Sequence, residues 1–188
     1  MANFEQALDR VLKNEGGYCK LEGDTGGETY KGVSRNNFPD WIGWDMIDAA
    51  KHGDFPACLD KSPQLAELIQ DLYRTQFWNA VLGDDIANQG LAFTLFDMAV
   101  NSGVSRAVEG FQCAFNMTFI DRLKVDGVLG PKTIAALKGC DDDDAAHVDS
   151  LLTAIRAGFY LGLCAAVPAK RVFKEGWLNR VYDKVDNP

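Results

Sequence analysis

The spacing of hydrophobic residues near the N-terminus predicts an amphipathic helix over residues 3–15. Four hydrophobic residues recur at intervals of one helical turn: Phe4, Leu8, Val11 and Leu12. They mark one buried face of this helix. Glu15 falls on the same face, and Gly16 and Gly17 directly after it end the helix. The helix therefore carries a carboxyl group at its C-terminal end, on the side of its hydrophobic residues.

Seven further segments are expected to be helices, which makes the fold mainly α-helical. Their ranges are 45–52, 62–80, 88–101, 105–116, 132–137, 145–166 and 175–185. Ser62 followed by Pro63 is typical of an N-cap and a first helical residue. Segment 88–101 is apolar nearly all round, which is typical of the buried centre of a helical bundle. The four aspartates at 141–144 fit a helix N-terminus better than a calcium loop, which needs a glycine and a distant glutamate.

Residues 16–33 are rich in glycine and polar residues and show no helical pattern. They predict turns or a small β-hairpin. A carboxyl that ends a helix beside this segment, against apolar side chains, is expected to lose water. Loss of water disfavours the charged form, so we expect Glu15 to hold a proton and to act as a general acid.

A second carboxyl lies in the same segment, because Asp24 and Thr29 follow Glu15 at short spacing. Glycoside hydrolysis needs two carboxyls in unlike environments. In that chemistry Glu15 protonates the leaving oxygen, Asp24 stays ionised and activates water, and Thr29 holds the water. Glu22 and Glu28 are alternatives to Asp24. A simpler interpretation also stays open for Glu15, as a half-exposed residue at a helix end with no role.

The residues around Glu15 form two motifs. They are Glu15-Gly16-Gly17-Tyr18 and Asp24-x-Gly26-Gly27-x-Thr29-Tyr30-x-Gly32-Val33. This pattern resembles the signature of the glycoside hydrolase 108 lysozymes, which are N-acetylmuramidases. The spacing of the glutamate, aspartate and threonine is also similar to the triad of phage T4-type lysozymes, with an offset of one residue at the threonine. The resemblance implies Glu15 as the catalytic acid and supporting roles for Asp24 and Thr29.

The similarity continues in order along nearly the whole chain. Residues 73–78 are like the aromatic helix of the family, 91–103 like its central helix, and 174–181 like its end. Residues 123–137 resemble the peptidoglycan-binding type 3 region found next to that catalytic segment. We therefore expect a catalytic region over 1–104 and a helical peptidoglycan-binding type 3-like region over 105–188, packed as one globular unit. The expected fold is lysozyme-like, with a small β-hairpin or loop region near the N-terminus.

The resemblance implies a bacteriolytic, endolysin-like enzyme that cleaves the β-1,4 bond between N-acetylmuramic acid and N-acetylglucosamine. The peptidoglycan glycan strand is the expected partner, and this chemistry requires neither a metal nor an organic cofactor. Four residues are expected to contact the substrate: Tyr18, Tyr30, Asp97 and Asn101. The alternatives are a lytic transglycosylase, which uses one buried glutamate and releases an anhydro-sugar, a wall-binding protein that does not cut, and an enzyme for a related polymer such as chitin.

Two features allow both a structural and a functional interpretation. Asp97 lies within the apolar segment 88–101, where pairing with a neighbouring helix is favoured over a place in a sugar-binding groove. Trp41 and Trp44 share one helical face. They suit either a sugar platform or the core, because aromatic faces stack on pyranose rings and also fill interiors.

Composition limits the partners. The chain has 188 residues, a net charge of −8 and a pI of about 4.7, which argues against nucleic acid and against an anionic membrane surface. We expect a monomer without membrane insertion. The first residues do not resemble a signal peptide. We therefore expect synthesis in the cytoplasm, export by a holin or a secretion machinery, and action in the periplasm or at the cell wall. The five cysteines are expected to be reduced thiols.

Overall fold

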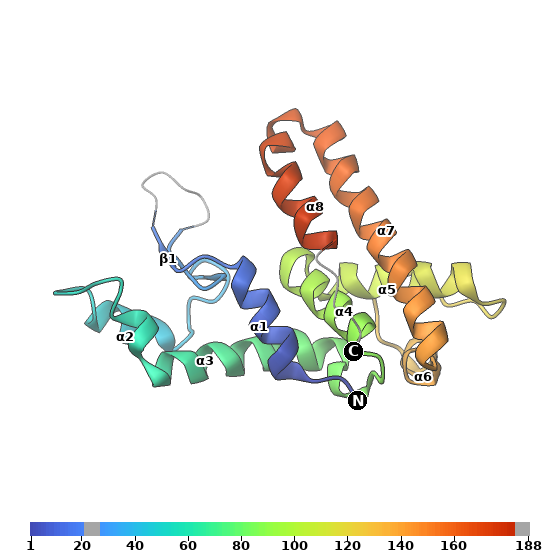
Figure 1. The fold of residues 1–188 in the computed structure, drawn as a ribbon, viewed down its shortest axis with the longest axis horizontal. Coiled ribbons are helices and arrows are strands. Elements are labelled where there is room, and N and C mark those ends of the chain that lie inside the picture. The colour runs from blue at the N-terminus through green and yellow to red at the C-terminus, as the bar shows by residue number, and fades with distance from the viewer. Residues whose placement is uncertain (21–26, 183–188) are drawn as a thin grey trace. The chain divides into compact units, whose positions relative to one another are not determined.

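The computed structural model describes residues 1–20 and 27–182, and these residues are mainly α-helical (Figure 1). The α-helices of this part are α1 Phe4–Asn14, α2 Gly43–Ala49, α3 Pro63–Tyr73, α4 Gln89–Ser102, α5 Val104–Thr118, α6 Pro131–Gly139, α7 Asp142–Ala166 and α8 Lys174–Tyr182. Shorter helical turns are η1 Leu59–Lys61, η2 Arg74–Trp78, η3 Asn79–Val81, η4 Gly83–Asp85 and η5 Pro168–Phe173. The prediction of a mainly α fold is confirmed.

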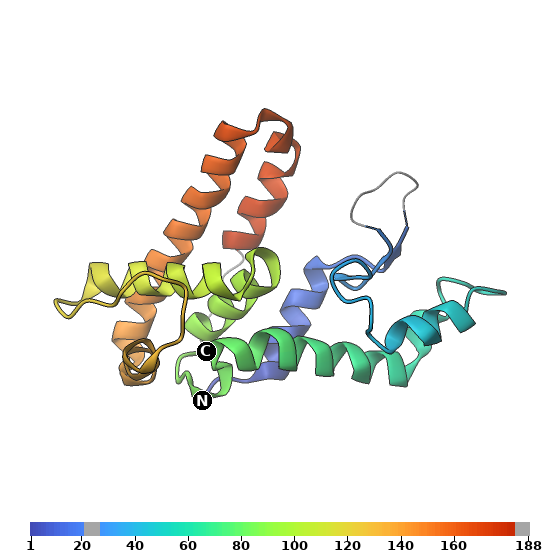
Figure 2. The same ribbon diagram turned by 180° about the vertical axis from the view of Figure 1, so that it is seen from behind.

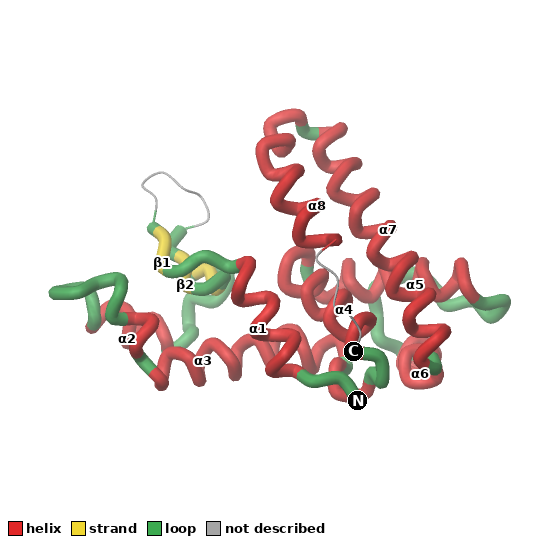
Figure 3. The backbone as a smooth tube through the Cα atoms, in the orientation of Figure 1, coloured by secondary structure: helices red, strands yellow, loops and turns green. Residues whose placement is uncertain are grey.

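Three two-residue strands form an antiparallel sheet near the N-terminus (Figure 3). They are β1 Tyr18–Cys19, β2 Thr29–Tyr30 and β3 Val33–Ser34, in the order β1-β2-β3. The turn between β2 and β3 consists of Lys31 and Gly32, with φ angles of 44° and 79°. Positive φ at both central residues is the geometry of a type I′ hairpin turn, and glycine adopts it without steric cost. The predicted small hairpin region is therefore present.

The chain folds as two compact units. One comprises Leu8–Gln76, and the other combines Met1–Ala7 with Phe77–Pro188. The first holds the sheet, α2, α3 and η1, with α2 packed against α3. We call it the sheet unit, and we call the second the helical unit.

Helix α4 forms the centre of the helical unit, as its all-round apolar pattern predicts. Every residue from 91 to 99 is buried, and α4 packs against both α5 and α7. Asn88 caps the helix by accepting a hydrogen bond from the Leu91 N–H at 3.0 Å. Phe96 from this helix meets Phe4 and Trp78 at ring-centroid separations of 6.0 and 5.5 Å. The first residues of the chain thus contribute an aromatic side chain to this core.

Helix α7 has 25 residues and is apolar enough to cross a membrane by length and composition alone. The core helix of a soluble protein passes the same test, and α7 packs against α4, α5 and α8. Figures 1 and 2 both show α8 running back along the C-terminal half of α7. Asp141 caps α7 by accepting from the Asp144 N–H at 2.9 Å, and the next three acids occupy its first turn. The N-terminal interpretation of the aspartate run is confirmed.

Helix α3 ends earlier than the sequence predicts. Ser62 caps it as expected and Pro63 begins it, but the α-helical pattern stops at Tyr73 and continues as the π-helical turn η2. The Thr75 hydroxyl donates to the Asp71 carbonyl oxygen at 2.7 Å. Such a hydroxyl competes with the backbone N–H for a helical carbonyl and often bends the helix. Hydrophobic spacing alone does not reveal this change of winding.

Candidate active site

Glu15 lies directly after α1, in the sheet unit, and is half-buried. Its backbone N–H donates to the Leu12 carbonyl at 3.3 Å, which closes the last turn of the helix. Val11, one turn earlier, is fully buried. The carboxyl therefore projects from the end of a helix whose inner face is anchored in the core, as the sequence pattern predicts.

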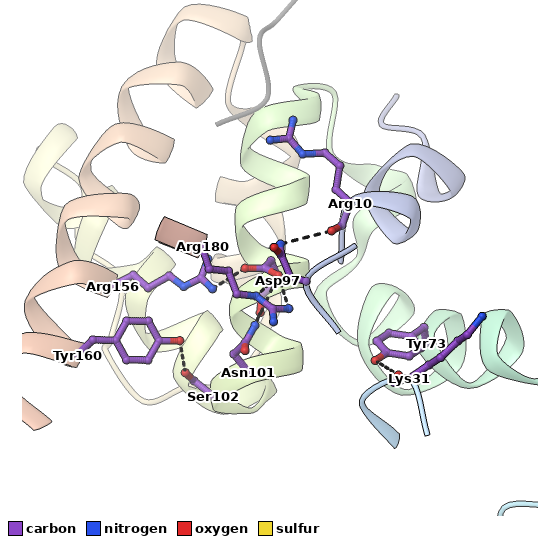
Figure 4. Close-up of polar contacts among 10 residues, drawn as sticks. Arg10, Lys31, Tyr73, Asp97, Asn101, Ser102, Arg156, Tyr160 and Arg180 are labelled. Atoms are coloured by element: carbon purple, nitrogen blue, oxygen red, sulfur yellow. Dashed lines mark hydrogen bonds and ion pairs between the residues drawn. The ribbon is translucent and has the colours of Figure 1, made fainter. Parts of the chain in front are cut away.

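The turn between β2 and β3 packs directly onto this carboxyl. A Cβ atom built on Gly32 would lie 2.7 Å from Glu15 Oε2 and 2.5 Å from the Tyr73 hydroxyl oxygen. Tyr73 is 1% exposed, and its hydroxyl donates to the Lys31 carbonyl at 2.8 Å (Figure 4). Only a residue without a side chain fits between the turn, the carboxyl and the phenol. The Gly32 backbone and the Tyr73 hydroxyl therefore lie beside the Glu15 carboxyl.

The register of the sheet separates the predicted site residues onto two faces. Cys19 pairs with Thr29, and Thr29 pairs with Ser34, so these three side chains share one face. Tyr18 and Tyr30 pair with each other on the opposite face. Thr29 is half-buried and Tyr30 is buried. Thr29 and Tyr30 are adjacent in the motif, but their side chains point to opposite faces of the sheet.

Tyr30 belongs to the core of the sheet unit. It is 2% exposed, and its hydroxyl donates to the Leu59 carbonyl at 3.3 Å. Burial, followed by the nearby charge of Asp60, raises the pKa of Tyr30 to about 12. Packing in the core therefore accounts for a tyrosine at position 30, without the predicted contact with substrate. Tyr18 is half-buried and packs edge-on against Phe55 with centroids 4.6 Å apart, so its substrate contact stays a prediction.

Glu28, one alternative for the second carboxyl, is held in a cluster of charged groups. It is 7% exposed and accepts from the Tyr18 hydroxyl at 2.6 Å. Arg35 Nε lies 2.7 Å from its Oε2, and Lys51 Nζ lies 2.8 Å from its Oε1. Burial raises its pKa, but the hydrogen bonds from Lys51 and Tyr18 and the charge of Arg35 outweigh burial, so the net shift is downward. Both oxygens are committed to structural partners.

Burial and the hydrogen bond to Glu28 raise the pKa of Tyr18 to about 12, so this phenol stays protonated and keeps donating. Glu28 is therefore an ionised structural residue rather than a group that activates water. Asp24 and the other alternative, Glu22, lie outside the described residues. No group of three or more possible metal ligands occurs among residues 1–20 and 27–182.

Asp97 lies in the helical unit, within α4, and is fully buried (Figure 4). Arg156 Nη2 from α7 donates to its Oδ2, and Arg180 from α8 donates to its Oδ1 from Nε at 2.9 Å and from Nη2 at 2.7 Å. Asn101, which is exposed, donates to the Asp97 carbonyl oxygen at 2.7 Å. The structure thus gives Asp97 the helix-pairing role that the sequence analysis favoured. A substrate contact by Asn101 stays a prediction.

The glycosyl hydrolase 108 family matches residues 8–103, slightly more than half of the chain. The chain belongs to this family. It is therefore a glycoside hydrolase, and the expected family is confirmed. A second family, described as a predicted peptidoglycan domain, matches residues 106–182. The two matches together support a peptidoglycan hydrolase.

Among solved structures, the chain is similar to SagA of Brucella abortus. The two are 27% identical with a TM-score of 0.65, and the similarity covers 95% of this chain and 88% of that one. A search of curated proteins found no significant match.

In this family 108 protein, the region that matches the predicted peptidoglycan domain contains a turn held by one buried glutamine. Gln112 is fully buried, and its Oε1 accepts from the Asp126 and Gly127 N–H groups at 2.9 and 3.0 Å. Its Nε2 donates to Asp126 Oδ1, the Val128 carbonyl and Thr133 Oγ1, at 3.1 to 3.2 Å. The Asp126-Gly127 turn is thus tied to α5 by the buried side chain of Gln112.

Proposed function

We propose that this glycoside hydrolase is an N-acetylmuramidase, which cleaves the β-1,4 bond between N-acetylmuramic acid and N-acetylglucosamine with Glu15 as the general acid. The observation that carries the proposal is the contact of the Lys31-Gly32 turn with the Glu15 carboxyl. A catalytic carboxyl must be held in one orientation to transfer its proton to a glycosidic oxygen. Because Gly32 has no side chain, the turn and Tyr73 can lie close enough to the Glu15 carboxyl to hold it in one orientation.

Asp24 and Thr29 take the supporting roles in this proposal. Asp24 in its ionised form activates the attacking water, and the Thr29 hydroxyl orients that water. The proton of Glu15 goes to the leaving sugar oxygen as the glycosidic bond breaks. Water supplies the new hydroxyl at the anomeric carbon and gives up its other proton to Asp24. Glu28 is unsuitable as a substitute for Asp24 because both of its oxygens already bind Arg35, Lys51 and Tyr18.

The test compares Glu15→Gln with wild type in clearing of purified peptidoglycan. Glu5→Gln is the matched control, because Glu5 is an exposed glutamate in α1, the helix that Glu15 follows. We expect the clearing rate of Glu15→Gln to fall by about 1,000-fold or more, while the variant still sediments with sacculi. Glu5→Gln is expected to match wild type. Clearing by Glu15→Gln at the wild-type rate would refute the role of Glu15.

Mass spectrometry of the released fragments distinguishes the rival reaction. A muramidase adds water and leaves reducing N-acetylmuramic acid ends, whereas a lytic transglycosylase leaves anhydro-sugars of lower mass. We expect reducing ends. We also propose that the protein acts where its polymer lies, at the cell wall, after release by a holin or a secretion machinery.

A further inference from the structure

The segment that joins α7 to α8 is exposed along its whole length. Every residue from 165 to 176 is exposed, and these residues comprise the end of α7, the turn η5 and the start of α8. Figures 1 and 2 both show this segment at the end of the α7–α8 hairpin that lies farthest from α4 and α6. Its side chains therefore face solvent rather than the core of the helical unit. We call residues 165–176 the hairpin tip.

The hairpin tip carries large apolar side chains. Val172 is 79% exposed and Phe173 is 56% exposed, and Val167 is exposed as well. All eleven phenylalanines lie in the described part of the chain, and Phe173 is the one among them that is exposed. The Phe173 ring packs with one side against Trp177, with ring centroids 5.6 Å apart. Exposed apolar side chains that lie together mark a surface that binds a partner or a membrane.

Three exposed cations lie among these apolar side chains, namely Lys170, Arg171 and Lys174. Arg171 Nε donates to the Cys164 carbonyl at 3.3 Å, and none of the three cations has an ion pair with a carboxylate in the described part of the chain. Glu175 is the one acid of the tip, so three cations and one acid give it a formal charge of +2. The tip therefore combines apolar side chains with unpaired positive charge.

This local charge is opposite in sign to that of the whole chain. The net charge of −8 by itself disfavours contact with an anionic surface. At physiological ionic strength, however, exposed charges are screened over about 8 Å. Residues 150–174 contain no aspartate or glutamate, so α7 brings no acid close to the tip. An anionic surface that touches the tip therefore meets mainly positive charge.

Helix α7 adds apolar surface next to the tip. A window of 18 residues in this helix is apolar enough for a bilayer, yet only 39% of that window is buried in the fold. Leu161, which lies shortly before the tip, is exposed. The middle of α7 is held in the core, because Arg156 binds the buried Asp97. Contact with a bilayer is therefore confined to the tip and the end of α7, which suits a place on the membrane surface and not a membrane span.

We propose that the hairpin tip binds the surface of an anionic phospholipid bilayer. Val172 and Phe173 enter the boundary between the headgroups and the acyl chains, and the three cations contact the lipid phosphates. Basic side chains suit this depth because their apolar stems lie against the acyl chains while their charged ends reach the headgroups. A neutral polymer would leave all three cations without an anionic partner. This contact goes beyond the hydrolysis proposed above and takes no part in it.

The direct test is sedimentation of the full chain with vesicles. One set of vesicles contains phosphatidylcholine alone, and the other contains equal parts of phosphatidylcholine and the anionic lipid phosphatidylglycerol. We expect binding to the anionic vesicles that weakens as salt is added, because salt screens the attraction. A lack of binding to anionic vesicles at low salt overturns the proposal. Equal binding to both sets also overturns it, since the cations then contribute nothing.

Removal of two lysines tests the cations. Each cation near an anionic surface is worth about fivefold in affinity, so the double variant Lys170→Gln, Lys174→Gln should bind the anionic vesicles about 25-fold more weakly. The double variant Lys124→Gln, Lys132→Gln is the matched control, because it removes two exposed lysines of the helical unit outside the tip. We expect the control to bind like wild type. Equal binding by the two double variants overturns the proposal, because the tip then has no special role.

Phe173→Ser tests the apolar contact, and we expect it to weaken binding about tenfold. Ile120→Ser is its control, because Ile120 is 97% exposed and lies outside the tip. Wild-type binding by Phe173→Ser would show that this ring does not enter the bilayer and would overturn that part of the proposal. Circular dichroism checks that each variant folds. The lysine variants change exposed side chains alone, so they decide the question even if Phe173→Ser loosens the hairpin.

Lipid-free sacculi separate this proposal from the function proposed above. The tip variants are expected to clear such sacculi at the wild-type rate, because no lipid is present. If they instead lose binding to sacculi and keep binding to vesicles, the tip recognises the wall polymer and the proposal is overturned. If Glu15→Gln still clears sacculi, the role of Glu15 fails, and the vesicle experiment still reports on the tip.

Discussion

Replacement of Gly32 by alanine tests whether the β2–β3 turn positions Glu15. The change has two effects. Alanine at a φ of 79° is strained by about 1–2 kcal/mol, because its Cβ crowds the backbone in the left-handed region. Its Cβ also meets the Glu15 carboxyl and the Tyr73 hydroxyl. To reach ordinary contact, Glu15 Oε2 must retreat from 2.7 to about 3.4 Å, a shift of about 0.7 Å.

A displacement of this size matters for a proton donor. A misplacement of about 1 Å lowers rates by about 100-fold, so we expect Gly32→Ala to reduce kcat between about 10- and 100-fold. Because Tyr73 must move too, its hydrogen bond to the Lys31 carbonyl is also expected to weaken. The assay is the initial rate of peptidoglycan clearing at saturating substrate, with unfolding followed by circular dichroism.

Gly53→Ala is the matched control. Gly53 also has a positive φ, of 64°, but an added Cβ there meets no atom within 4 Å. The two variants should therefore lose a similar amount of stability, about 1–2 kcal/mol each, and only Gly32→Ala should lose activity. If both retain wild-type kcat, or if both lose it equally, the turn does not position the catalytic group and the reasoning is refuted.

Two further predictions concern charged groups inside the units. Asp97→Ala leaves Arg156 and Arg180 without their common carboxylate. We expect the free energy of unfolding, measured by urea titration, to fall by about 3–5 kcal/mol. A change below about 1 kcal/mol would contradict a structural role for Asp97. Glu28→Gln tests the lowered pKa of Glu28. The stability that the Glu28 carboxylate contributes to the fold is present above pH 4.5, its ordinary pKa, and is lost as the pH falls through the lower pKa of the folded state. The stability difference between wild type and Glu28→Gln should therefore be full at pH 7 and shrink below pH 4.5, whereas a constant difference down to pH 3 would contradict it.

Features that depend on nearby residues could be predicted from the sequence. The cap at Ser62, the buried stretch within α4 and the helix end at Glu15 all follow from local patterns of spacing and side-chain type. Such patterns show which face of a helix is buried. They do not show which other helix covers that face, because many arrangements bury the same residues.

Partners distant along the chain could not be predicted for this reason. Asp97 binds Arg156 and Arg180, which follow it by 59 and 83 residues. Gln112 holds a turn 14 residues away, and Tyr73 reaches the Lys31 carbonyl across 42 residues. In each case the sequence shows a polar residue in an apolar setting, which signals a buried partner without naming it. The winding of η2 was missed for a different reason, because π-helical turns have no strong sequence signal.

The alternation of side chains along a strand could have separated the predicted roles of Thr29 and Tyr30. Thr29 and Tyr30 are adjacent in β2, so one strand cannot turn both toward the same cleft. The Lys31-Gly32 turn then fixes the register, which places Tyr30 opposite Val33 in the core and Thr29 opposite Ser34 on the other face. The motif therefore combines residues of two kinds. Tyr30 and Gly32 belong to the hairpin whose turn contacts Glu15, whereas Thr29 is half-buried on the other face of the strand, and its role in orienting water stays a prediction.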